Sequence, residues 1–142
     1  MKNFTKKHSR KDMRGAEAKF QTKFTRWLRN FGWTGAYELK VAIGENAMPF
    51  VALADHQRAA LLAAKHGRVV FKLPDDSRCI KPFDEFCLSG TSAVVVVHWQ
   101  RRGNKEFFII DIDDWCKAEQ ESKRRSITES QAREIGRAFL LG

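Results

Sequence analysis

Hydrophobic and polar positions recur along the chain with two different periods, and the changes of period divide it into helices and strands. Between residues 15 and 31 large apolar side chains recur every three or four positions, which predicts an amphipathic helix. Residues 52–65 are rich in Ala and Leu and predict a second helix, ended by Gly67. Runs of β-branched and aromatic residues between turn signals predict strands. The strands are expected at residues 36–43, 68–73, 92–99 and 106–112, an irregular extended segment at 78–88, and two further helices at 113–125 and 128–141.

The order of these elements predicts one α/β (α+β mixed) domain over residues 14–142, with helices flanking a central mixed sheet. The chain has 142 residues, a length that suits a single domain. Residues 92–99 read SAVVVVHW, an apolar run typical of a strand that is buried on both faces. We therefore expect this strand at the centre of a sheet of about four to five strands.

Positive charge is concentrated at the start of the chain. The net charge is +9, and residues 1–31 contain ten Lys or Arg residues against Asp12 and Glu17. Such an excess favours a polyanionic partner, with nucleic acid first and an anionic membrane surface second. Residues 1–13 are interpreted as a flexible basic tail, or alternatively as a solvated terminus without function. The side chains expected to contact DNA are Lys6, Lys7, Arg10, Lys11, Arg14, Lys19, Lys23 and Arg26.

The cysteines and the apolar runs indicate where the protein acts. Cys79, Cys87 and Cys116 are odd in number and form no CxxC pair, which favours a reducing compartment over a disulfide framework or a zinc site. No apolar run approaches the roughly 18–20 residues of a membrane span, and the first residues contain no signal-peptide core. We expect a cytoplasmic protein of a bacterium or of a phage-infected host cell, with no membrane partner.

One acid–lysine pair differs from the rest of the charge pattern. Glu-x-Lys occurs at residues 17–19, 38–40 and 121–123. On a helix, residues i and i+2 point roughly 200° apart, so the first and third pairs are interpreted as ordinary helix-surface charges. Glu38 and Lys40 belong to a predicted strand, where i and i+2 share a face. They are either a solvated ion pair worth about 0–1 kcal/mol, or the acid and the cation of a metal-dependent phosphodiesterase site.

The metal-dependent interpretation requires a second carboxylate near this pair. Mg²⁺ prefers hard oxygen ligands, which one or two carboxylates supply together with phosphate and water. Asp84, in the segment KPFD, is the best candidate, with a simple turn acid after a proline as the alternative. Asp75, Asp76 and Glu45 are weaker candidates because each lies in a loop-like segment.

Three short motifs follow one another in order: Glu38-Leu39-Lys40, Met48-Pro49-Phe50, and His56-Gln57 at the start of a helix. This order resembles the core of RecU-type Holliday-junction resolvases, members of the PD-(D/E)XK nuclease superfamily. In that family a helix with an inward-facing acid precedes the strand, and Glu17 matches this acid. The family also places a metal-binding Asp shortly before E-x-K, but residues 30–37 contain no acid. The resemblance therefore implies a permuted or migrated motif, with Asp84 in that role.

The resemblance also implies a mechanism and partners. The sheet would be restriction-endonuclease-like, and the activity would be Mg²⁺-dependent DNA cleavage, with Mn²⁺ able to substitute. Asp84 and Glu38 would hold the metal, while Lys40 would stand beside the attacking hydroxide. Gln57 would position water or the phosphate backbone, and Glu17 would act as an outer ligand. The resemblance also implies that the substrate is branched DNA and that the protein is a homodimer. Its role would be in phage or bacterial recombination or DNA processing.

Each of these features has an alternative. The same site could cleave linear or single-stranded DNA, or the chain could be a basic DNA-binding protein without catalysis. His56 and Gln57 could be a solvated helix start. Trp33 and Tyr37 could stack on unpaired bases, although core packing is the preferred interpretation.

Overall fold

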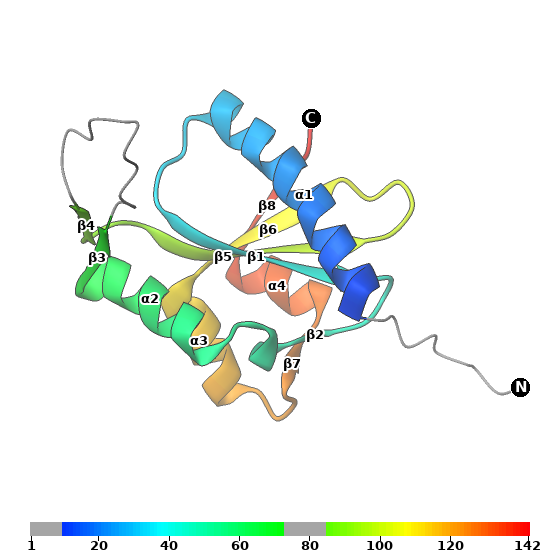
Figure 1. Cartoon of the computed structure of the whole chain (residues 1–142). Coiled ribbons are helices and arrows are strands. Elements are labelled where there is room, and N and C mark those ends of the chain that lie inside the picture. The colour runs from blue at the N-terminus through cyan, green and yellow to red at the C-terminus, as the bar shows by residue number, and fades with distance from the viewer. Residues whose placement is uncertain (1–9, 73–84) are drawn as a thin grey trace, which may run out of the picture.

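The centre of the protein is a four-stranded mixed sheet. The computed structural model describes residues 10–72 and 85–142, with side chains described from Arg14 onward. The strand order is β1-β5-β6-β8 (Figure 1). β1 (Ala36–Ile43) runs parallel to β5 (Ala93–Gln100), and β6 (Glu106–Asp111) and β8 (Arg137–Leu140) continue the sheet in antiparallel pairings. The predicted mixed sheet flanked by helices is confirmed.

Helices cover both faces of this sheet. α1 (Arg10–Phe31) lies across one face, where its Phe20 and Phe24 pack against Leu39 and Val41 of β1 (Figure 1). The other face carries α2 (Asp55–His66), α3 (Ile112–Glu121) and α4 (Glu129–Ile135). Side chains of β1 alternate between these two layers because successive residues of a strand point to opposite faces. Each residue of β1 is thereby assigned to the α1 layer or to the α2 layer.

β5 is the buried centre of the sheet, as the sequence predicts. Its seven residues from Ala93 to Trp99 are all buried. Trp99 packs with the α2-side core, while His98 points to the α1 side and stacks on Phe20 with ring centroids 4.7 Å apart. A strand covered on both faces needs apolar side chains on both, which explains why this run does not alternate.

Two short antiparallel pairs surround the main sheet. β2 (Met48–Pro49) pairs with β7 (Ser126–Ile127), and a 3₁₀ turn over Phe50–Ala52 leads from β2 into α2. β3 (Arg68–Lys72) and β4 (Glu85–Ser89) form a hairpin that extends from the end of α2. The helix predicted over 52–65 therefore begins three residues later than expected, at Asp55.

The final helix predicted over residues 128–141 is wrong in its second half. α4 ends at Ile135, and residues 137–140 form the edge strand β8 beside β6. Gly136 separates the two elements and lies against β6: a Cβ there would be 2.8 Å from Cγ1 of Ile110 and 2.9 Å from the backbone oxygen of Ile109. The segment AFLL pairs with β6 at the edge of the sheet instead of continuing a helix.

The first helix is longer than predicted. It begins at Arg10, so residues 10–13 belong to α1, while residues 1–9 lie outside the described part of the chain. Trp99 and Trp115 are fully buried, and Trp33 and Tyr37 pack partly buried beside α1, in agreement with the preferred core interpretation. Across residues 10–72 and 85–142, none of the helices combines the length and the apolarity needed to cross a bilayer.

Candidate active site

β1 places Glu38 and Lys40 together on the sheet face that carries α2. Leu39 and Val41, which alternate with them, are buried under α1 on the opposite face. The residues beside the pair on β5 are Val95 and Val97. The sequence prediction that one strand face would hold both charges is therefore confirmed. The neighbouring positions on β5 are apolar.

The two charged groups are close together and only partly exposed. Nζ of Lys40 lies 3.9 Å from Oε2 of Glu38. The Lys40 side chain is 11% exposed and that of Glu38 is 33% exposed. The Lys40 side chain is therefore largely buried, and that of Glu38 is partly buried.

Gln57 connects this pair to the start of α2. Its Nε2 donates a hydrogen bond to Oε2 of Glu38 over 3.1 Å, and its Oε1 accepts one from the backbone N–H of Ala54 over 3.0 Å. The second bond caps the first turn of α2, where backbone N–H groups have no partner within the helix. The cap fixes the amide orientation, and the amide in turn fixes one oxygen of Glu38.

The surroundings of Glu38 disfavour its ionised form. Burial raises the pKa of Glu38 above its ordinary value of 4.5, and the nearby charge of Glu17 raises this pKa further, while Lys40 and His56 lower it. Glu17 comes from α1 and His56 from the exposed start of α2. Side chains from three elements thus act on one carboxylate, and a pKa raised in this way is typical of a functional site.

The second carboxylate expected on a neighbouring strand is not supplied by β5. The residues of β5 beside the pair are valines, and Asp84, Asp75 and Asp76 lie outside the described residues. Glu45 is exposed, and its Oε1 lies 3.8 Å from Nε of Arg101, at the turn beyond β1. Within the described chain Glu17 is the carboxylate that acts on Glu38, and no group of three or more His, Cys, Asp or Glu side chains there is arranged to hold a metal ion.

The predicted DNA-contacting side chains are only partly described. Arg14, Lys19, Lys23 and Arg26 are exposed on α1. Arg10 and Lys11 belong to the backbone of α1, whereas Lys6 and Lys7 lie outside the described residues. The exposed basic face of α1 is consistent with the predicted helix pattern.

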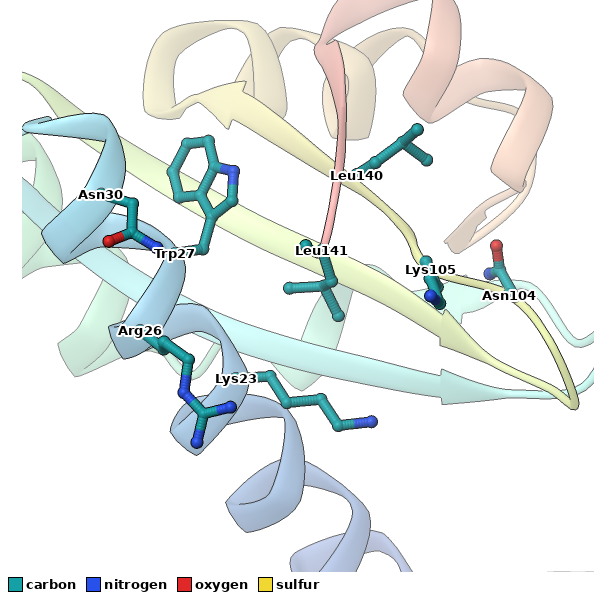
Figure 2. Close-up of a pocket in the computed structure, with 9 residues that line it drawn as sticks. Lys23, Arg26, Trp27, Asn30, Asn104, Lys105, Leu140 and Leu141 are labelled. Atoms are coloured by element: carbon teal, nitrogen blue, oxygen red, sulfur yellow. The ribbon is translucent and has the colours of Figure 1, made fainter.

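Two features escaped the sequence prediction. Lys65 at the end of α2 contacts both Asp111 and Asp113 at the start of α3, with Nζ–Oδ distances of 2.8 and 2.5 Å. A cavity beside α1 contains Lys23 and Arg26 together with Lys105, from the turn between β5 and β6 (Figure 2). Both features join residues more than 40 positions apart, so no local sequence pattern predicts them.

The comparisons with known proteins add no assignment to this geometry. The chain matches no protein-family model, no curated protein and no solved structure.

Proposed function

We propose that the protein is a metal-dependent DNA endonuclease, with Glu38 and Lys40 at the reacting phosphodiester. The observation that carries this proposal is the strand-borne acid–lysine pair, 3.9 Å apart, with Gln57 holding the acid in place. The net charge of +9 and the exposed cations of α1 suit a nucleic-acid substrate. Branched DNA is the substrate that the motif resemblance suggests.

The charges of Glu38 and Glu17 suit the binding of a divalent cation. Glu38 and Glu17 are close enough that the charge of Glu17 raises the pKa of Glu38, so a cation bound between carboxylates would relieve this repulsion. Glu38 would be a direct ligand, Glu17 a second or outer ligand, and Asp84 a further ligand from outside the described residues. A bound Mg²⁺ would lower the pKa of a water molecule and neutralise charge on the phosphate.

The protein's own side chains would position the substrate. Lys40 directs its ammonium group from a largely buried side chain, so it presents a fixed positive charge to a non-bridging phosphate oxygen or to the attacking hydroxide. Gln57 holds Glu38 in one orientation through the α2 cap. This arrangement supplies charge at the reacting phosphate with little reorganisation.

Cleavage assays test the proposal directly. Labelled four-way junctions, linear duplexes and single strands are incubated at equal concentration with Mg²⁺ or Mn²⁺. We expect cleavage by the wild type and a loss of about 10²–10³-fold or more in Glu38→Gln and in Lys40→Ala. Matched controls are Glu121→Gln and Lys123→Ala, because this exposed pair has the same spacing but does not lie on a strand: Glu121 is the last residue of α3, and Lys123, which was expected on the helix, lies beyond its end. Cleavage that survives both Glu38→Gln and Lys40→Ala would refute the assignment.

A DNA-binding protein without catalysis is the second candidate. The net charge of +9 and the exposed cations of α1 favour it as much as they favour the endonuclease. It predicts salt-sensitive DNA binding, no site in a calorimetric Mn²⁺ titration and intact DNA after long incubation. A Mn²⁺ site that disappears in Glu38→Gln would instead support the endonuclease.

We also propose a homodimer, because a four-way junction presents two symmetric positions for cleavage. Sedimentation velocity of the free protein and of its junction complex measures this. Two copies bound to one junction are expected, and a single copy that cuts both strands would contradict it.

A further inference from the structure

A basic cavity lies on the α1 side of the sheet, beyond the candidate active site. Its volume is about 370 Å³, and it opens between α1, the turn from β5 to β6, and the residues after β8 (Figure 2). Trp27 and Leu141 supply apolar walls, and the cations at its rim are Lys23, Arg26 and Lys105. All three cationic side chains belong to exposed residues.

The charged side chains that line this cavity are all cationic, and the backbone of Gly142 also contributes to its lining. None of the described side chains that line it is acidic. Cations that share a small opening repel one another, and an anion placed among them removes this repulsion. Lys23 and Arg26 are three residues apart on α1 and so lie on neighbouring positions of the helix surface, while Lys105 reaches the same cavity from another element.

The turn that carries Lys105 is held in one conformation. Nδ2 of Asn104 donates a hydrogen bond to the backbone oxygen of Trp99 over 2.6 Å, and Oδ1 of Asn104 accepts one from the backbone N–H of Glu106 over 3.1 Å. The backbone oxygen of Lys105 accepts a hydrogen bond from the N–H of Leu141 over 2.9 Å. The backbone of Lys105 is therefore fixed relative to Leu141, one wall of the cavity, which reduces the ordering needed to bind a ligand.

The aromatic wall favours a sugar–phosphate backbone over a base. The Trp27 ring already stacks on Phe31 at 4.6 Å and on Phe24 at 5.6 Å between centroids, with interplanar angles of 15° and 16°. A base would need a free ring face for stacking. The indole therefore contributes an apolar edge, which suits the sugar next to a phosphate.

We infer that the cavity bounded by Lys23, Arg26 and Lys105 binds a backbone phosphate of the nucleic acid that the protein acts on. This inference rests on the proposed function for the choice of partner. Glu17 acts on Glu38 from α1, whereas Lys23 lines the cavity from the same helix. On the helical period the two side chains point roughly 120° apart, to different flanks of α1.

Fluorescence anisotropy in EDTA tests this inference without any cleavage. Labelled duplexes of two unrelated sequences are titrated with wild type, Lys23→Gln, Lys105→Gln and Lys117→Gln at several salt concentrations. Lys117 is the matched control because it is an exposed lysine of α3, on the other face of the sheet. We expect Lys23→Gln and Lys105→Gln each to weaken binding about threefold for both sequences and to lower the salt slope by about 1, with Lys117→Gln unchanged.

The outcome for Lys105 decides the inference, because this residue is outside the basic helix. An unchanged affinity and salt slope in Lys105→Gln would overturn it, even if Lys23→Gln binds weakly.

A free nucleotide is the other source of the same phosphate chemistry. If millimolar deoxyadenosine monophosphate displaces the DNA and does so only when Lys23 and Lys105 are present, the cavity is a nucleotide site and the inference is wrong. A protein that binds DNA through Lys105 yet never cleaves it would refute the endonuclease alone.

Discussion

Gln57 donates a hydrogen bond from Nε2 to Oε2 of Glu38 over 3.1 Å, and so ties the cap of α2 to the acid on β1. The bond joins residues 19 positions apart. One amide therefore serves helix stability through its oxygen and the candidate active site through its nitrogen. These two roles can be separated by substitution. A carboxylate can accept the hydrogen bond that caps α2, but it cannot donate one to Glu38.

Gln57→Glu is expected to preserve the cap and to impair the site. The new carboxylate can still accept the hydrogen bond from the N–H of Ala54, but it cannot donate to Glu38 and adds a like charge beside it. The pKa of Glu38 should rise further, so the acidic limb of the pH–rate profile for DNA cleavage should move to higher pH. The measurement is kcat/KM for cleavage against pH.

The control for this variant comes from the second capping box of the chain. Gln131 accepts a hydrogen bond from the N–H of Thr128 over 2.9 Å at the start of α4, in the same role as Gln57 on α2. Gln131→Glu should leave the pH–rate profile where it is. Equal shifts in both variants would mean that capping alone explains the effect.

Glu38→Gln is expected to stabilise the protein at neutral pH while it abolishes cleavage. Burial, and secondarily Glu17, raise the pKa of Glu38 in the folded state above 4.5. The folded state therefore prefers the protonated acid, and the contribution of Glu38 to stability is present below about pH 4.5 and is lost as the pH rises through the folded pKa. Because Gln resembles the protonated acid, Tm should rise by roughly 1–4 °C at pH 7.5 and much less at pH 4.

Thermal unfolding at these two pH values measures this difference. A destabilised Glu38→Gln at pH 7.5 would show that the ionised carboxylate is favourable in the fold. In that case the site would be an ordinary ion pair, and its interpretation as a functional site would lose its electrostatic support.

The ion cluster between α2 and α3 should stabilise the fold only within a range of pH. Hydrogen bonds from Lys65, and secondarily from His66, hold the pKa of Asp113 below 3.8, and bonds to Asp111 and Asp113 raise the pKa of Lys65 above 10.5. The contribution of this cluster to the free energy of unfolding is present above the ordinary Asp pKa. In acid it is lost as the pH falls through the lowered pKa of Asp113, and in base it is lost as the pH rises through the raised pKa of Lys65. Asp113→Asn should therefore reduce stability between about pH 4 and pH 10, and the difference should shrink at pH 3.

Urea unfolding of Asp113→Asn against pH measures the range. The loss should be at most about 1 kcal/mol, because both side chains are partly exposed to solvent. Asp114→Asn is the matched control, since Asp114 occupies the same first turn of α3 and is exposed. A pH-dependent loss of equal size in Asp114→Asn would assign the effect to the helix dipole.

The sequence predicts the features that depend on a local pattern, but not those that depend on how distant elements pack. Glu38 and Lys40 could be placed on one strand face because the period of two is local, and β5 could be placed at the sheet centre because its apolar run is continuous. The bond from Gln57 to Glu38 and the reach of Lys105 into the cavity depend on how distant elements pack. No periodicity carries that information, so these contacts appear only in the folded chain.

The end of α4 is the clearest case of packing that overrides a local pattern. Residues 128–141 keep a helical arrangement of apolar positions, yet the chain leaves the helix at Gly136 because β6 is too close for any side chain there. Gly136 has φ −112° and ψ −172°, an extended conformation that other residues also adopt, so space and not backbone strain demands glycine. The tight contact also sets where β8 starts to pair with β6.

Gly136→Ala should therefore destabilise the protein, by about 1–3 kcal/mol, although alanine is the better helix former. The added Cβ would meet the backbone oxygens of Ala132 and Ile109, both at 2.9 Å, and these atoms cannot move without disturbing α4 and β6. Gly15→Ala is the matched control, because Gly15 lies in α1 with nothing within 4 Å of its Cβ position. There the same substitution should stabilise by roughly 0.5–1 kcal/mol. Urea unfolding measures both changes, and a neutral Gly136→Ala would mean that α4 can continue past this residue and that β8 is not fixed by it.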